Sequence, residues 1–142
     1  MIEPVAVHEM PLEAMKLRAA ATDPAVGAVV VFEGCARDHH AGQGVDALAY
    51  EAFVPMAVAE LQRLRTEAMA HFGLRRCLIH HRIGPVPLTE AAVVVVTASA
   101  HRREAFEAAI WIMDRIKERV PIWKKESYTQ GGAAWVEGTE RR

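Results

Sequence analysis

The sequence predicts an α+β fold in a single compact domain that spans residues 1–142. Short apolar, β-branched runs predict strands, and segments with apolar residues at helical spacing predict helices. These elements follow one another without the strict strand–helix–strand rhythm of a parallel α/β protein. The chain contains no internal repeat, low-complexity tract or linker, which favours one domain throughout.

The N-terminal quarter of the chain predicts one short strand and one helix. Val5 and Val7 alternate with their neighbours, which indicates a strand. Pro11 suits the first turn of a helix, and Asp23-Pro24 ends that helix.

The next segment predicts two strands, a loop and a helix. Gly27–Glu33 is almost continuously apolar, as in a buried strand. It leads into GCARDHHAGQG, residues Gly34–Gly44, which we interpret as a polar, mobile loop. Ala47–Ala52 predicts another strand, after which Pro55 begins a helix that Gly73 ends.

The second half predicts one long helix among four strands. The helix covers Ala105–Glu118, and Val120-Pro121 stops it. The strands are expected at Cys77–Ile83, Ala91–Ala98, Ile122–Tyr128 and Ala134–Val136.

Composition and charge favour a cytoplasmic protein that binds neither nucleic acid nor membrane. The net charge is -1, so any cationic site must be local. The N-terminal MIEPVAVHEM does not resemble a secretory signal, and the longest apolar run, Ala91–Val96, is too short to cross a bilayer. We therefore expect Cys35 and Cys77 to be reduced thiols.

Two basic segments follow predicted strands and are candidate anion sites. His101, Arg102 and Arg103 come directly after a strand, at the start of the long helix. Cations there oppose the helix dipole at a cost of about 0.3–1 kcal/mol each, and a bound anion would reverse that effect. Arg37, in the small-residue loop, could bind a phosphate bidentately. The alternative for each arginine is simple exposure to solvent.

Two lysine positions are also candidates. Lys117 falls at the border between the apolar and charged sides of the long helix, where partial burial would make it usable as an acid, base or nucleophile. Alternatively, it extends to solvent and complements the helix dipole. In Lys124-Lys125-Glu126 the two lysines face opposite sides of an extended segment, so only one should enter a given pocket. Either could instead be a charge that protects a sheet edge.

The histidine pairs do not predict a metal site. His39-His40 and His80-His81 are adjacent in sequence, so their side chains point apart in a strand. No third ligand follows at a suitable spacing, and no P-loop, GxGxxG or GxSxG pattern is present.

Five segments taken in order carry a resemblance to a known family. They are GAVVVFEGCARDHH, YEAFVPMA, HHRIG, SAHRREAFEA and MDRIKERVPIWKKE. Between about Gly27 and Trp135 the chain resembles the large, catalytic subunit of molybdopterin synthase. The AHR–helix–KxxxPxWK combination is the specific part. The resemblance implies a mixed or antiparallel sheet of the α/β-hammerhead kind with about three helices.

The resemblance implies a sulfurtransferase with a protein partner. Family members convert cyclic pyranopterin monophosphate into molybdopterin by adding two sulfur atoms as a dithiolene. The sulfur arrives as a thiocarboxylate on the C-terminal Gly-Gly tail of a small ubiquitin-like subunit. The large subunit is a homodimer flanked by two small subunits, a heterotetramer, and the resemblance implies neither a cofactor nor a metal.

The same resemblance assigns site residues to this sequence. The two catalytic residues are Lys117 and Lys124. The implied substrate contacts are Cys35, Ala36, Arg37, His101, Arg102, Lys117, Lys124, Lys125 and Glu126. Cys35 departs from the family pattern, because relatives carry lysine or threonine at that position. The resemblance still implies a contact between the backbone of Cys35 and the substrate, because that contact does not need the side chain.

The length of the predicted helix adds a constraint on the site. Arg102 and Lys117 are 15 residues apart, which is roughly 22 Å along a helix. A pterin monophosphate is too short to bridge that distance. We therefore expect each site to combine Lys117 and Lys124 of one subunit with His101 and Arg102 of its dimer mate.

Two alternative functions remain open at this point. One is a persulfide sulfurtransferase that depends on Cys35, whose position in the predicted loop is suited to a reactive thiol. The other is a non-catalytic module that binds the extended tail of a partner as an added strand. Replacing Cys35 by serine separates the first from the thiocarboxylate reaction.

Overall fold

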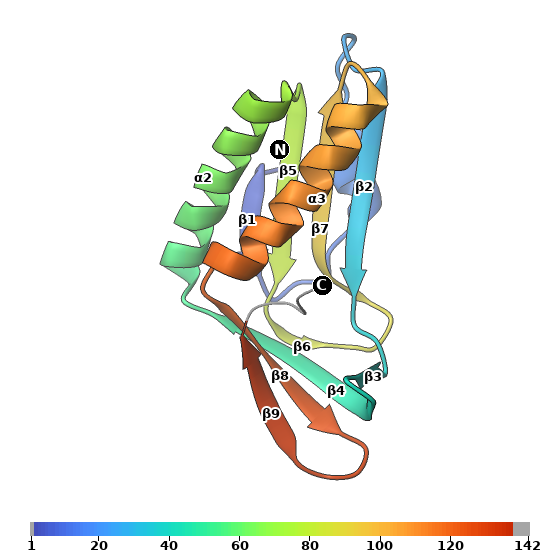
Figure 1. Cartoon of the computed structure of the whole chain (residues 1–142), viewed down its shortest axis with the longest axis vertical. Coiled ribbons are helices and arrows are strands. Elements are labelled where there is room, and N and C mark those ends of the chain that lie inside the picture. Colours follow the sequence, from blue (N-terminus) through green and yellow to red (C-terminus); the bar gives the residue numbers. More distant parts are fainter. Residues whose placement is uncertain (1, 138–142) are drawn as a thin grey trace.

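The computed structural model describes residues 2–137 and confirms the α+β prediction. Within this range the chain forms three helices and nine strands in two sheets. Figure 1 shows two long helices lying over the larger sheet and the smaller sheet extending below them.

The larger sheet is mixed. Its order is β1-β5-β7-β2, and within residues 2–137 it consists of β1 (Val5–His8), β5 (Arg76–Arg82), β7 (Ala91–Ser99) and β2 (Ala28–Cys35). The strands β1 and β5 run parallel, whereas β5–β7 and β7–β2 are antiparallel. Residues Ala92–Ser99 of β7 are all buried, which explains the continuous apolar run in that part of the sequence.

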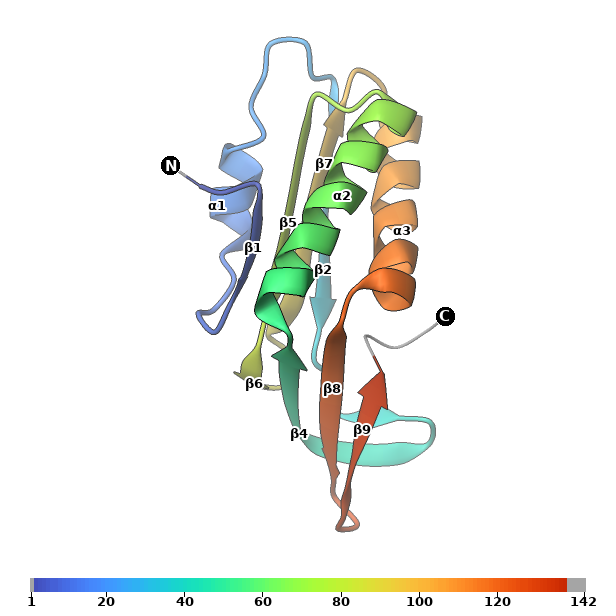
Figure 2. The same cartoon turned by 90° about the vertical axis from the view of Figure 1, so that its left-hand side faces the viewer.

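The helices cover both faces of this sheet. They are α1 (Ala14–Ala19), α2 (Val54–Phe72) and α3 (Arg102–Arg119). In Figure 2, α2 and α3 lie on one face and α1 on the other. None of the helices within residues 2–137 is long and apolar enough to cross a bilayer.

The prediction that the first helix begins at Pro11 is wrong. Leu12 packs against the smaller core cluster from the link before the helix, which begins only at Ala14.

The smaller sheet forms the lower part of the molecule. Its strands are β3 (His39–His40), β4 (Gln43–Ala52), β8 (Ile122–Tyr128) and β9 (Ala133–Glu137), in that order, with β6 (Gly84–Val86) also paired to β4. Strand β8 has the predicted bounds. The antiparallel pairing of β4 with β8 sets Tyr50 beside Lys124 and Leu48 beside Glu126.

The segment predicted as a mobile loop is largely strand. Strand β2 continues to Cys35, and β3 and β4 form a hairpin in which His40 pairs with Gln43. Ala41 and Gly42 between them have φ of 53° and 80°. Such left-handed values at both positions of a two-residue loop match the twist of the flanking strands. The hairpin therefore has a defined register.

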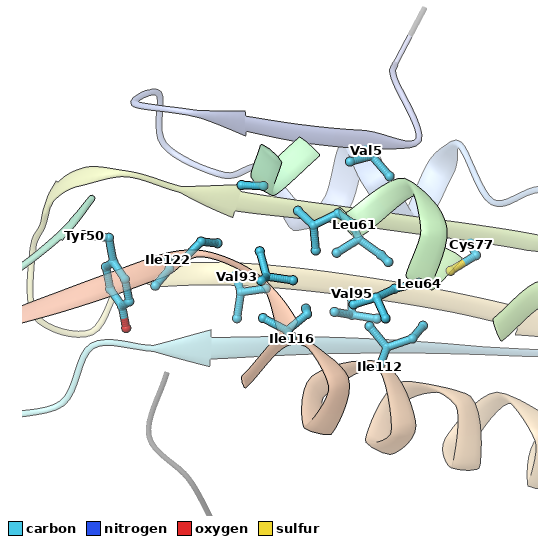
Figure 3. Packing of buried hydrophobic residues seen from close by; sticks show 14 of the residues in the cluster. Val5, Tyr50, Leu61, Leu64, Cys77, Val93, Val95, Ile112, Ile116 and Ile122 are labelled. Carbon is cyan, nitrogen blue, oxygen red and sulfur yellow. The ribbon is translucent and has the colours of Figure 1, made fainter. Parts of the chain in front are cut away.

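The main core lies between the long helices and the larger sheet. Figure 3 shows Leu61 and Leu64 of α2 and Ile112 and Ile116 of α3 meeting β7, with Tyr50 and Ile122 of the smaller sheet extending the cluster. Burial of each large aliphatic side chain contributes about 1.5–3 kcal/mol. Ile116 and Ile122 anchor the end of α3 and the start of β8. They thereby fix the backbone on either side of the turn at Val120-Pro121.

Candidate functional site

One pocket collects most of the predicted site residues at the junction of the two sheets. It is bounded by β2 and the link after it, the β3–β4 hairpin, β7, the end of α3, and β8. Its lining residues are Phe32, Gly34, Cys35, Ala36, Arg37, His39, His40, Leu48, Tyr50, Ala92, Val93, Met113, Lys117, Lys124 and Glu126.

Three cationic side chains line this pocket. Lys117 comes from the last turn of α3 and is half-buried, Lys124 comes from β8, and Arg37 follows the end of β2. The side chain of Lys124 is only 7% exposed. Cations at a partly dehydrated site attract anions more strongly than they do in water. The pocket is therefore suited to a negatively charged substrate.

Glu126 is a buried carboxylate among these cations. Its side chain is 1% exposed, and Lys124 Nζ lies 3.4 Å from its Oε2 atom. His40 Nδ1 lies 2.8 Å from the carboxylate, and the Tyr128 hydroxyl donates to Oε1 over 3.0 Å. Burial raises the pKa of Glu126, but the hydrogen bonds from His40 and Tyr128 and the charge of Lys124 outweigh it and leave the pKa lowered. The carboxylate is therefore ionised at neutral pH.

The backbone at Ala36 is held by the turn that precedes β7. The Ala36 amide donates to the Glu90 carbonyl over 2.9 Å, and the Thr89 amide donates to the Ala36 carbonyl over 2.7 Å. These bonds fix the chain immediately before Arg37. The resemblance implies substrate contacts at Cys35, Ala36 and Arg37, and these bonds give the backbone of that segment a rigid support.

Cys35 is the thiol of the pocket. Although Cys35 is largely exposed, slight burial of its thiol and the nearby charge of Glu33 raise its pKa. A raised pKa lowers the thiolate fraction, which is the nucleophilic form. The environment of Cys35 therefore does not favour the persulfide alternative. Cys35 and Cys77 are both free thiols in the structure.

Three predicted contacts lie outside this pocket. His101 and Arg102 are exposed at the start of α3, which is the end of the helix remote from Lys117 (Figure 1). Lys125 is exposed, and its Nζ atom lies 5.8 Å from the ring centroid of Trp135 in the neighbouring strand. Lys124 and Lys125 thus face opposite sides of β8.

Other lining residues were not predicted as site residues. His40 appeared in the sequence only as half of a histidine pair, and nothing local indicates that a hairpin brings it to Glu126, 86 residues away. Tyr50 reaches the pocket through the pairing of β4 with β8. Met113 of α3 lines the pocket one turn before Lys117.

The fold and the pocket define an α+β protein with a cationic site between two sheets. The chain belongs to the MoaE protein family, whose model matches residues 7–119. This membership bears out the resemblance to molybdopterin synthase catalytic subunits.

Relatives of this chain include named sequences and solved structures. The molybdopterin synthase catalytic subunit of Pyrococcus abyssi is 46% identical over 79% of this chain and 75% of its own length. The one from Aspergillus fumigatus is 40% identical over 84% of this chain but only 64% of its own length. The chain thus spans slightly less than two thirds of the fungal relative.

The structural comparisons agree with the sequence comparisons. The crystal structure of molybdopterin synthase from Staphylococcus aureus matches with a TM-score of 0.89 and 34% identity, over 96% of this chain and 98% of that one. A complex of subunits 1 and 2 of molybdopterin-converting factor from Helicobacter pylori matches with a TM-score of 0.74 over 98% of this chain and 92% of that one. At 19% identity, this second match shows the fold alone. These comparisons confirm the predicted family and the predicted fold. They also confirm the predicted enzyme class, that of molybdopterin synthase catalytic subunits.

Proposed function

We propose that this chain transfers sulfur from a thiocarboxylated carrier to cyclic pyranopterin monophosphate and so forms the dithiolene of molybdopterin. The carrier is a small ubiquitin-like subunit with a C-terminal Gly-Gly thiocarboxylate. The observation that carries the proposal is the meeting of Lys117 and Lys124 with Arg37 in one pocket. The two lysines are the proposed catalytic residues.

The proposed chemistry uses the charges of the pocket. Two thiocarboxylates are used in turn, one for each sulfur atom. In each transfer the thiocarboxylate sulfur attacks a carbon of the pterin side chain, a new C–S bond forms, and a C–O bond at that carbon breaks, with its oxygen leaving on the phosphate or as water. Water then breaks the acyl C–S bond, so that sulfur stays on the pterin and the carrier leaves as a carboxylate. Lys117 and Lys124 attract the anionic tail and stabilise the negative charge that develops in both steps. The half-buried setting of Lys117 and the burial of Lys124 strengthen this effect.

The phosphate of the substrate is assigned to Arg37, His101 and Arg102. Since His101 and Arg102 lie at the remote end of α3, the proposed site takes them from a second copy of the chain. Each pocket then combines Arg37, Lys117 and Lys124 of one subunit with His101 and Arg102 of its mate.

The exposed apolar side of α3 supports such a homodimer. Phe106 and Ile110 are 57% and 64% exposed and lie one turn apart on the helix. The midpoint between Arg102 and Lys117 falls beside Ile110, at the middle of this apolar side. An antiparallel, two-fold contact of α3 with its copy around Ile110 would set Arg102 of each subunit opposite Lys117 of the other.

The adjacent sheet edge belongs to the same proposed interface. Strand β2 contacts α3 and ends the strand order of the larger sheet within residues 2–137. Phe32 on this strand lines the pocket and is 38% exposed. Exposed large apolar side chains that form a patch are typical of subunit contacts. The proposed assembly is this homodimer flanked by two carrier subunits, a cytoplasmic heterotetramer with reduced Cys35 and Cys77.

A direct assay tests the function. The purified chain is incubated with cyclic pyranopterin monophosphate and the thiocarboxylated carrier, and the dithiolene product is measured. A carrier that ends in an ordinary carboxylate is the matched control and should give none. Binding of the carrier tail without turnover would instead support the non-catalytic module. Absence of product with a verified thiocarboxylate would overturn the proposed function.

A further inference from the structure

His40 and Glu126 form a contact that joins two distant parts of the chain inside the pocket. His40 lies in β3, and Glu126 lies in β8, 86 residues later. The Nδ1 atom of His40 is 2.8 Å from each carboxylate oxygen of Glu126. At this distance a protonated Nδ1 donates a charge-assisted hydrogen bond.

The surroundings of Glu126 make this hydrogen bond consequential. Its carboxylate is 1% exposed and accepts a second bond from the Tyr128 hydroxyl. A buried carboxylate that loses a donor must move or draw in another cation. Lys124 is a nearby cation, and its Nζ atom lies 3.4 Å from Oε2 of Glu126.

The distance between Lys124 and Glu126 shows how Lys124, His40 and Tyr128 share the carboxylate of Glu126. Both side chains point to the same side of β8, since the residues are two apart in a strand. Their 3.4 Å separation is longer than the roughly 2.7–2.9 Å of a strong ammonium–carboxylate hydrogen bond. His40 and Tyr128 occupy the carboxylate at shorter distances, 2.8 Å and 3.0 Å. The ammonium group of Lys124 is thus held beside Glu126 without a close hydrogen bond to it.

We propose that His40 is a positioning residue, which through Glu126 keeps the ammonium group of Lys124 available to the substrate in the pocket. This inference rests on the proposed function, in which Lys124 acts on the thiocarboxylate. Without the His40 bond, the Glu126 carboxylate turns to Lys124 and pairs with it closely. Lys124 then loses its reach towards the sulfur, although its charge remains.

The test compares two replacements of His40 in the full chain with the thiocarboxylated carrier. His40→Leu removes the donor, whereas His40→Asn keeps an amide N–H near the position of Nδ1. We expect His40→Leu to lower kcat by about 10-fold to 100-fold, because small misplacements of a catalytic group have effects of this size. The KM for the pterin substrate should change much less, and His40→Asn should recover most of the lost kcat.

Controls separate this effect from misfolding and from failure of the proposed function. His71→Leu removes an exposed histidine at the end of α2, outside the pocket, and should keep wild-type kcat. If His40→Leu does not fold by circular dichroism, Tyr128→Phe removes the other donor to Glu126 and should lower kcat in the same direction by less. Wild-type kcat in His40→Leu, or equal losses in His40→Leu and His40→Asn, would overturn the proposal. Absence of product from the wild-type chain would instead indicate that the proposed function itself is wrong.

Discussion

Arg102 and Lys117 lie at opposite ends of α3, so one chain cannot bring both side chains to the same small substrate. The helix runs from Arg102 to Arg119, and 15 residues of helix span roughly 22 Å. The pocket contains Lys117 but not Arg102. Arg102 and Lys117 belong to the same helix, but the length of that helix keeps their side chains apart.

A mixed dimer of two inactive variants is expected to regain activity. In a dimer of an Arg102→Ala chain with a Lys117→Ala chain, one site carries both substitutions and the other carries neither. Random 1:1 mixing makes half of the dimers mixed, so activity should return to about a quarter of the wild-type value. The two chains are co-expressed with different tags, and turnover is measured with the thiocarboxylated carrier.

The tags also supply the control for this experiment. Doubly tagged dimers, purified on both tags, should reach about half of wild-type activity, whereas each parent alone stays inactive. Activity no higher than that of the two parents would show that each chain builds its own complete site.

Replacing Lys124 and Lys125 in turn should separate the two faces of β8. Lys124→Ala removes a buried pocket cation, and we expect kcat to fall by about 100-fold, as for other single groups that stabilise developing charge. Lys125→Ala removes a neighbouring cation that lies over Trp135, and kcat should change only slightly. The measurement is kcat for both variants side by side. A comparable loss in Lys125→Ala would mean that the substrate or the carrier tail also contacts the outer face of β8.

The sequence predicts those strands and helices that are determined by neighbouring residues alone. The bounds of β8 agree with prediction, and β7 extends only one residue beyond its predicted end. The apolar β-branched run of β7 needs no distant partner to be recognised. Strand β6 was missed, because it contains Pro85 and exists through pairing with β4. The sequence of the β3–β4 hairpin predicts a loop instead, since it is polar and carries neither alternation nor a common turn dipeptide.

The candidate site was only partly predictable for the same reason. Lys117 and Lys124 come together because Val120-Pro121 turns the chain between two anchored elements, a feature visible in the sequence. The contact of His40 with Glu126 depends on where the hairpin docks, and no spacing in the sequence encodes it. A buried carboxylate with three partners therefore became visible only in the structure.

Replacing Cys35 by serine should leave most of the activity in place. Serine keeps the size of the side chain and the backbone at the pocket, while it cannot carry a persulfide. The raised pKa of Cys35 already disfavours the nucleophilic thiolate. Turnover of Cys35→Ser with the thiocarboxylated carrier is compared with that of Cys77→Ser, a replacement of the other, buried thiol. Complete loss in Cys35→Ser alone would support the persulfide sulfurtransferase.

The fold should lose stability below neutral pH because of His81. This histidine is fully buried, donates from Nδ1 to the Arg82 carbonyl and packs edge-to-face on Tyr50. Burial lowers its pKa from 6.5 to about 4. The unfolded chain therefore binds a proton near pH 6.5, whereas the folded chain does so only near pH 4. As the pH falls through this window the free energy of unfolding should drop by about 3 kcal/mol, and the loss is complete below pH 4.

Urea unfolding at several pH values between 7 and 4 measures this loss. The comparison is with His81→Asn, whose amide can still donate to the Arg82 carbonyl but does not titrate. The variant should be less stable at pH 7, because it packs less well, and its stability should fall less steeply towards pH 4. His80, whose pKa burial also lowers, is present in both proteins and leaves some acid sensitivity in the variant. Equal slopes in the two proteins would show that the proton uptake on unfolding comes from other groups.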